Sequence, residues 1–220
     1  MTVSEAVLSR RSIRAFKPDP VPLETLRRVM DKARWAPSGC NFQPWEATIV
    51  TGAPLAELQA KMLSSPMQDP IEYSWSDPEV IPECKARLHA VGAAMYQAMG
   101  VGRADADARA DFVRNNATSF GAPAVLLCYF DRRMGPPQWS DVGMWLQTFM
   151  LLLREEGLDS CPQEFLSMYA RLIKEFIGVS DETHIFFCGI AIGYRDEGNP
   201  VNGFSREREP VDGNVRFLGF

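Results

Sequence analysis

Apolar residues recur with two different spacings along the chain, and these spacings separate predicted helices from predicted strands. After Pro22, apolar residues repeat every three or four positions, which predicts an amphipathic helix that ends near residues 35–37. Unbroken apolar runs over 124–130 and 185–192 instead have the length of strands that are buried on both faces. A further strand is predicted over 46–51, before a Gly-Ala-Pro break.

The helical periodicity returns several times, and one of these helices is unusual. Residues 140–156 are apolar on nearly every side, so this helix is expected to be buried all round, either in the centre of the domain or against a second subunit. Gly157 is the expected terminator of this helix. The other predicted helices cover 3–8 (with Ser4 as a cap), 54–62, 83–100, 104–116 and 167–177.

Two segments lack a regular pattern. Residues 64–83 contain four prolines, which exclude a continuous helix or a central strand. Irregular segments of this length often wall a binding site, so this excursion, with its aromatic residues Tyr73 and Trp75, is a predicted active-site wall. The second segment, 199–220, is polar and rich in glycine but ends in apolar residues, which predicts a C-terminal arm anchored on another surface.

The composition is that of a single globular domain over residues 1–220. Hydrophobic residues make up 46% of the chain and charged residues 23%, which are ordinary values for a folded domain. Helices alternate loosely with a few strands, and this order favours an α+β fold with a covered sheet. The net charge of −5 argues against nonspecific nucleic-acid binding, which relies on clustered cations.

Several other classes of protein are disfavoured by missing motifs. The five cysteines form no C-x-x-C pair, so a disulfide framework is not expected. The two histidines, His89 and His184, are far apart, and no metal site is expected. Phosphate-loop, dinucleotide-fold and G-x-S-x-G hydrolase signatures are also missing. Without a visible signal peptide or a long apolar stretch, the chain is expected to be cytoplasmic, with no membrane partner.

The candidate chemistry lies in two clusters near the N-terminus. Arg10, Arg11, Ser12 and Arg14 offer guanidinium and hydroxyl donors that suit a phosphate group. The loop over 37–45 is dense in small hydrogen-bonding side chains, whose mixed donors and acceptors suit the edge of a flat heterocycle. Each cluster alone has an ordinary explanation, as solvent-exposed charge or as a helix-to-strand connection. Together they predict a pocket for a phosphorylated aromatic cofactor.

These segments, with others in the same order, resemble the FMN-dependent nitroreductase family. The resemblance covers residues 4–220. It implies an α+β fold with a central mixed, mostly antiparallel sheet flanked by helices, and an intertwined homodimer that exchanges its C-terminal arms. It rests on R-R-S-x-R-x-F (Arg10 to Phe16), A-P-S-G-C-N-F-Q-P-W (Ala36 to Trp45), G-A-P-A-V (Gly121 to Val125), D-V-G-M (Asp141 to Met144), Gly193-Tyr194 and R-E-P-V (Arg208 to Val211).

The resemblance also implies which residues hold the flavin. The FMN phosphate would lie among Arg10, Arg11 and Ser12, with either Arg206 or Arg208 from the arm. The backbone near Glu164 would face the hydride-carrying nitrogen of the ring, in a turn led by Pro162. The remaining implied cofactor contacts are Arg14, Pro37, Ser38, Gly39, Asn41, Gln43 and Gln163, and the candidate walls of the acceptor site are Cys40, Tyr73, Trp75 and Phe120.

The implied activity is an oxidoreductase reaction in two stages. NADH or NADPH reduces FMN and leaves, and a nitroaromatic or quinone-like acceptor then takes the electrons in a ping-pong sequence. No catalytic side chain is needed, because the flavin carries the chemistry. Two alternatives stay open: the same fold with other chemistry, such as reductive dehalogenation or flavin modification, and a flavin-binding protein without turnover.

Overall fold

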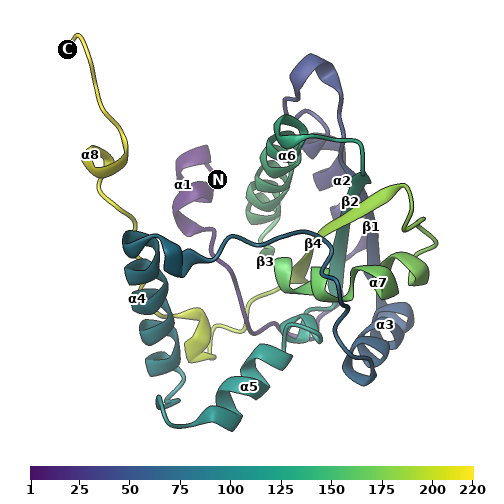
Figure 1. Ribbon diagram of the computed structural model, residues 1–220, viewed down its shortest axis with the longest axis horizontal. Coiled ribbons are helices and arrows are strands. Elements are labelled where there is room, and N and C mark those ends of the chain that lie inside the picture. The colour runs from purple at the N-terminus through teal and green to yellow at the C-terminus, as the bar shows by residue number, and fades with distance from the viewer.

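Four strands form one antiparallel sheet in a computed structural model that describes residues 1–220 (Figure 1). Their order is β1-β2-β4-β3. An isolated parallel bridge between Ser12 and Ser160 adds the N-terminal segment at the β3 edge, so the predicted mostly antiparallel sheet is confirmed. The strands are β1 (Glu46–Thr51), β2 (Ala124–Asp131), β3 (Asp159–Gln163) and β4 (His184–Gly193).

Helices cover both faces of this sheet, as the unbroken apolar runs predict. Side chains alternate along a strand, so Leu126 and Phe130 of β2 pack on one face while Val125 and Leu127 pack on the other. The first face carries α2 (Leu23–Ala33) and α6 (Pro136–Glu155). The second face carries α3 (Gly52–Ser64) and α7 (Ala170–Phe176).

The long apolar helix α6 is buried on one side only. Val142, Trp145 and Phe149 are buried against the sheet and α2, but Met144 on the opposite side is 40% exposed. A place in the centre of the domain is therefore wrong for α6, because its outer side has few neighbours within the chain, whereas packing against a second subunit stays a prediction. None of the helices has the combination of length and apolar sequence that a membrane crossing requires.

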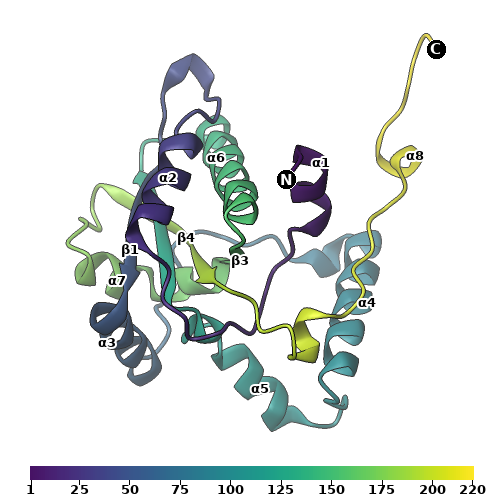
Figure 2. The ribbon, with the colours of Figure 1, turned by 180° about the vertical axis from the view of Figure 1, so that it is seen from behind.

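Four helices lie apart from the sheet. The short helix α1 (Val3–Ser9) and the C-terminal arm both lie on the side of α6 away from β1, as Figures 1 and 2 show. Neither α4 (Pro82–Ala98) nor α5 (Ala106–Arg114) contains a buried residue. The last helix, α8 (Val211–Asn214), is a single exposed turn in the arm. A large part of the apolar surface thus has no neighbour within the chain.

The edge strand β3 was not expected from the sequence. Pro162 lies inside it, opposite Ile190 of β4, and the chain turns only afterwards, into a 3-10 helix over Glu164–Tyr169. The predicted turn led by Pro162 is therefore wrong in its position. An edge strand tolerates proline because the missing N–H would have had no partner strand.

A buried ion-pair cluster holds the excursion over 64–83 against the sheet. Glu72 accepts hydrogen bonds from Lys174 Nζ at 2.7 Å and from Arg132 Nη2 at 3.0 Å. The Lys174 side chain has no exposed surface, and that of Glu72 is 3% exposed. Next to Glu72, the half-buried Tyr73 donates a hydrogen bond from its hydroxyl to the Phe187 carbonyl at 2.6 Å. Trp75 is exposed.

We predict that Lys174→Met lowers the free energy of unfolding by about 3 kcal/mol, because it leaves the buried Glu72 carboxylate without its nearest cation. Urea denaturation measures the change. The matched control is Lys61→Met, which removes an exposed pair with Glu57 at 3.7 Å and is expected to cost less than about 1 kcal/mol. Equal effects of the two substitutions would contradict a stabilising role for the buried cluster.

Candidate functional site

Arginines from both ends of the chain gather beside α1 and β3. Partial burial, followed by the charge of Arg208, lowers the pKa of Arg10. Burial, and then the charges of Arg10 and Arg11, lower the pKa of Arg206. Such shifts arise when like charges lie close together in a poorly solvated place. The cluster consists of Arg10, Arg11, Arg14, Arg195, Arg206 and Arg208.

Only one member of this arginine cluster is neutralised by an ion pair. The buried Asp159 carboxylate accepts from Arg195 Nη2 at 2.6 Å and from Arg154 Nη1 at 2.8 Å. The other five arginines of the cluster form no ion pair. An uncompensated group of cations of this kind is suited to a multiply charged anion, such as a phosphate.

Three contacts join the N-terminal segment to the C-terminal arm. Arg11 donates to the carbonyl of Phe204, and its guanidinium group lies over the Phe204 ring at 5.3 Å. Arg206 Nη2 donates to the carbonyl of Leu8 at 2.7 Å. The buried Asn202 side chain accepts from the Arg14 N–H at 2.9 Å. The sequence held no signal for Asn202, which is a single polar residue in an irregular segment.

The guanidinium groups of Arg10, Arg14 and Arg208 make no hydrogen bond to the other end of the chain. The Nε of Arg10 is buried and has no hydrogen-bond partner. Arg208 donates only to the carbonyl of its neighbour Glu207. Beside Ser12, the buried hydroxyl of Ser160 is also without a partner. These free donors are the positions where an anion would gain hydrogen bonds.

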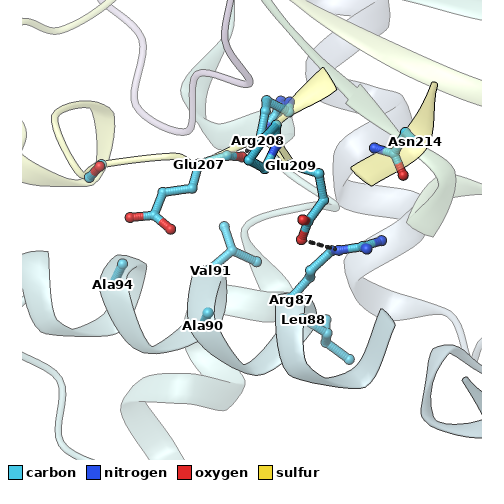
Figure 3. A pocket seen from close by; sticks show the side chains of 11 residues that line it. Arg87, Leu88, Ala90, Val91, Ala94, Glu207, Arg208, Glu209 and Asn214 are labelled. Carbon is cyan, nitrogen blue, oxygen red and sulfur yellow. Dashed lines mark hydrogen bonds and ion pairs between the residues drawn. The ribbon is translucent and has the colours of Figure 1, made fainter. Parts of the chain in front are cut away.

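Arg208 also borders a cavity with a volume of about 810 Å³. The cavity lies between α4 and the C-terminal arm, and Figure 3 shows the side chains of Glu207 and Glu209 pointing toward α4. Glu209 pairs with Arg87 Nε at 2.9 Å across it. Arg208 is therefore open to a ligand or to a second chain.

The loop over 37–45 has a strained backbone. Cys40, Asn41 and Gln43 have φ angles of 50°, 57° and 47°, in the left-handed region that non-glycine residues seldom adopt. The Gly39 N–H donates to both Asp141 carboxylate oxygens at 3.2 Å, which fastens the loop to the first half of α6. The side chains of Cys40, Asn41 and Gln43 are exposed. The loop thus presents its polar groups outward.

One chain does not bring this loop to the arginine cluster. The loop is fastened at Asp141, whereas the end of α1 is fastened at Arg154, whose Nε donates to Ser9 Oγ at 3.4 Å. The two anchors are thirteen residues apart on α6, which is about 20 Å along a helix axis. The expectation of a single pocket formed by both clusters is therefore not met within one chain.

The third expected group, over 162–164, lies at the end of β3. Pro162 and Glu164 are exposed, and Gln163 is buried. Gln163 Nε2 donates to the Asn116 carbonyl at 2.9 Å, but its Oε1 is buried without a partner. An unpaired buried oxygen is costly, so this end of β3 is also incomplete as it stands.

The four predicted acceptor-site residues have different surroundings. Phe120 is 7% exposed, and its ring centroid lies 5.9 Å from the ring centroid of Phe112. The Tyr73 ring packs edge-on against the Trp139 ring, with 5.3 Å between the ring centroids. Burial raises the pKa of the Tyr73 phenol. Cys40 and Trp75 are exposed. A surface that uses all four is not formed inside one chain.

Comparison with known proteins gives consistent results over the whole length. A model of the Nitroreductase family matches residues 7–194. The chain is 35% identical to 4-nitrobenzoate reductase from Pseudomonas putida, over 97% of this chain and 94% of that protein. The crystal structure of an FMN- and NADPH-dependent nitroreductase, NfnB from Sphigopyxis sp. strain HMH, superposes with a TM-score of 0.94 at 40% identity, over 100% of both chains. The FMN-dependent nitroreductase NfnB from Mycobacterium smegmatis, in complex with NADPH, has a TM-score of 0.92 at 29% identity, over 98% of this chain and 97% of that chain.

The burial of the cysteines predicts which thiols react. In the folded protein we expect iodoacetamide to modify the exposed Cys40 first and the half-buried Cys84 more slowly. Cys161 should stay unmodified at pH 8, because it is buried and burial raises its pKa to about 11. Peptide mass spectrometry reads the order, and urea-unfolded protein is the control in which all five cysteines react. Early modification of Cys161 would contradict this packing.

Proposed function

Because the chain belongs to the nitroreductase family, we propose that it is an FMN-dependent enzyme that uses NADPH to reduce nitroaromatic or quinone-like compounds. The observation that carries the proposal is the set of five arginines without ion pairs, which both ends of the chain contribute beside β3. Relatives across the whole length act on nitroaromatic compounds, including 4-nitrobenzoate. NADPH is the proposed donor because similar structures are described with it.

The donors present fit the phosphate of FMN. Arg10 and Arg208 are the proposed direct ligands, because Arg10 Nε is buried without a partner and Arg208 is bound only to its neighbour. Hydrogen bonds from charged groups contribute about 1.5–3 kcal/mol each. Bound FMN would supply the hydride chemistry, passing electrons from NADPH to the acceptor.

The chain's other residues would position the flavin and the acceptor. Asn41 and Gln43 carry exposed amides on a rigid, strained loop, which suits hydrogen bonding to the polar edge of the ring. The segment over 162–164 would approach from β3, with the backbone of Glu164 nearest the ring. Trp75, which is exposed on the excursion, would stack on the acceptor. Protons would come from solvent.

We further propose a homodimer in which the site is shared. The attachment points of the loop over 37–43 and of α1 are about 20 Å apart along α6, so the loop of one subunit would complete the arginine cluster of its partner. Exposed apolar side chains on α1 and on α6, including Val7, Leu8 and Met144, offer the surface for this association. The arm over 199–220 would cross to the partner, where its exposed residues Phe217 and Phe220 would be buried.

The activity is tested by separating its two stages. The purified protein is expected to be yellow, and NADPH should bleach the flavin absorbance under anaerobic conditions. A nitroaromatic acid such as 4-nitrobenzoate should then restore the colour without added oxygen, and steady-state kinetics should give the parallel double-reciprocal lines of a ping-pong sequence. A protein that binds FMN but is not bleached by NADPH or NADH would instead be a flavin-binding protein without turnover. Bleaching without reoxidation by nitro compounds would indicate a different acceptor chemistry.

We predict that Arg10→Ala and Arg208→Ala each weaken FMN binding by about 10- to 100-fold, because each removes a charged donor to the phosphate. Quenching of flavin fluorescence measures the dissociation constant. Riboflavin, which lacks the phosphate, should bind both variants as it binds the unchanged protein. The control is Arg216→Ala, an exposed arginine of the arm that forms no hydrogen bond or ion pair within the chain, which should leave FMN affinity unchanged. An unchanged affinity in the first two variants would refute this phosphate site.

The shared site predicts complementation between two inactive variants. Arg10→Ala damages the arginine cluster, and the pair Asn41→Ala with Gln43→Ala damages the loop. Co-expressed variants should recover about a quarter of the activity, because about half of the dimers are mixed and each mixed dimer has one undamaged site out of two. If both clusters served the same site within one chain, every site would carry a lesion and no activity would return.

A further inference from the structure

Two of the five arginines without ion pairs already have engaged guanidinium groups. Arg11 donates to the Phe204 carbonyl and stacks on its ring, and Arg206 donates to the Leu8 carbonyl. We infer that Arg11 and Arg206 are positioning residues that fasten the C-terminal arm to α1, and that this fastening places Arg208 beside Arg10 as the phosphate clamp. The inference rests on the proposed function, since it divides the roles within the proposed FMN phosphate site.

The two contacts are reciprocal. Arg11 follows α1 and reaches forward across 193 positions of sequence to Phe204, at the start of the arm. Arg206 lies two residues beyond Phe204 and reaches back to Leu8, in the last turn of α1. The last carbonyls of a helix have no partner within it and carry a partial negative charge, so a guanidinium group is a suitable donor for Leu8. Each end of the chain thus supplies one arginine to the other.

Few other contacts hold the outer arm. Residues 207–220 are all exposed. Their ion pair to the body, between Glu209 and Arg87, has both side chains about half exposed, at 40% and 51%. An exposed pair of this kind contributes at most about 1 kcal/mol. Within the chain, Asn202 fixes the base of the arm, and the contacts of Arg11 and Arg206 are therefore the main fastening of the residues between Asn202 and Arg208.

This fastening works against electrostatic repulsion. Arg206 lies near Arg10, Arg11 and Arg208, and its pKa is lowered by burial and by these charges. A bound dianion would relieve the repulsion, so phosphate binding and arm docking should strengthen each other by the same factor. FMN should then protect the arm, and loss of the fastening should weaken FMN binding even though neither Arg11 nor Arg206 touches the phosphate.

The decisive experiment measures arm release in the full-length protein freed of flavin. Chymotrypsin cleaves after Phe204, the residue that Arg11 covers, and intact-mass spectrometry follows the cut. Arg11→Ala and Arg206→Ala should each speed this cleavage about tenfold, which is the change expected when one hydrogen bond from a charged group is lost. The control Arg216→Ala should cleave at the rate of the unchanged protein, and Arg208→Ala, which removes a repelling charge, should cleave no faster. Arg206→Lys, which keeps a charged donor, should restore much of the protection.

The second measurement compares ligands with and without phosphate. FMN should slow cleavage after Phe204 in the unchanged protein, whereas riboflavin should not. The inference is overturned if Arg11→Ala and Arg206→Ala leave cleavage of the flavin-free protein unchanged while weakening FMN as much as Arg208→Ala does, since both would then be direct ligands. If the unchanged protein binds no FMN, the proposed function fails, but the flavin-free cleavage rates still decide whether the two arginines fasten the arm.

Discussion

Mutual repulsion among guanidinium groups is the constraint around which this site is built. Both ends of the chain bring arginines to one edge of the sheet, and only Arg195 meets a carboxylate there, that of Asp159. Burial, and then the charges of neighbouring guanidinium groups, lower the pKa of Arg10, Arg11 and Arg206. A bound phosphate dianion would turn this repulsion into binding energy for the cofactor.

The sheet supplies the rigid support that such a cluster needs. The edge strand β3 pairs with β4 on one side and carries the N-terminal segment on the other, through the bridge between Ser12 and Ser160. Asp159 at the start of β3 pairs with both Arg195 and Arg154, so the arginines that have no carboxylate partner lie nearer to Arg10 and the arm. Packing on both faces of β2 and β4 holds this edge in place.

The same architecture explains why one chain does not form a complete site. The strained loop is fastened to the first half of α6 and α1 to its last turns, and a straight helix keeps the two ends apart. The exposed side of α6 and the unburied helices α4 and α5 leave apolar surface that only another chain could cover. Shared sites and an exchanged arm are the arrangement that would satisfy both observations.

The local sequence pattern was sufficient to predict those elements whose burial and chemistry depend on residues close by in the sequence. The sequence predicted strands β2 and β4 and the amphipathic helix α2, because the periodicity of apolar residues shows which side of a segment is buried. It also indicated the clusters around Arg10 and Asn41, because the residue types show which chemistry a segment offers. Only the tertiary structure decided that Pro162 lies within a strand and that α6 is covered on one side. It also decided that Arg11 and Arg206 bind carbonyl groups at the other end of the chain, whereas Arg208 binds only its neighbour Glu207 and Arg10 Nε has no partner. The physical reason is the separation in sequence between the interacting residues. These outcomes depend on partners up to 198 positions away, and a local pattern does not specify where such partners meet.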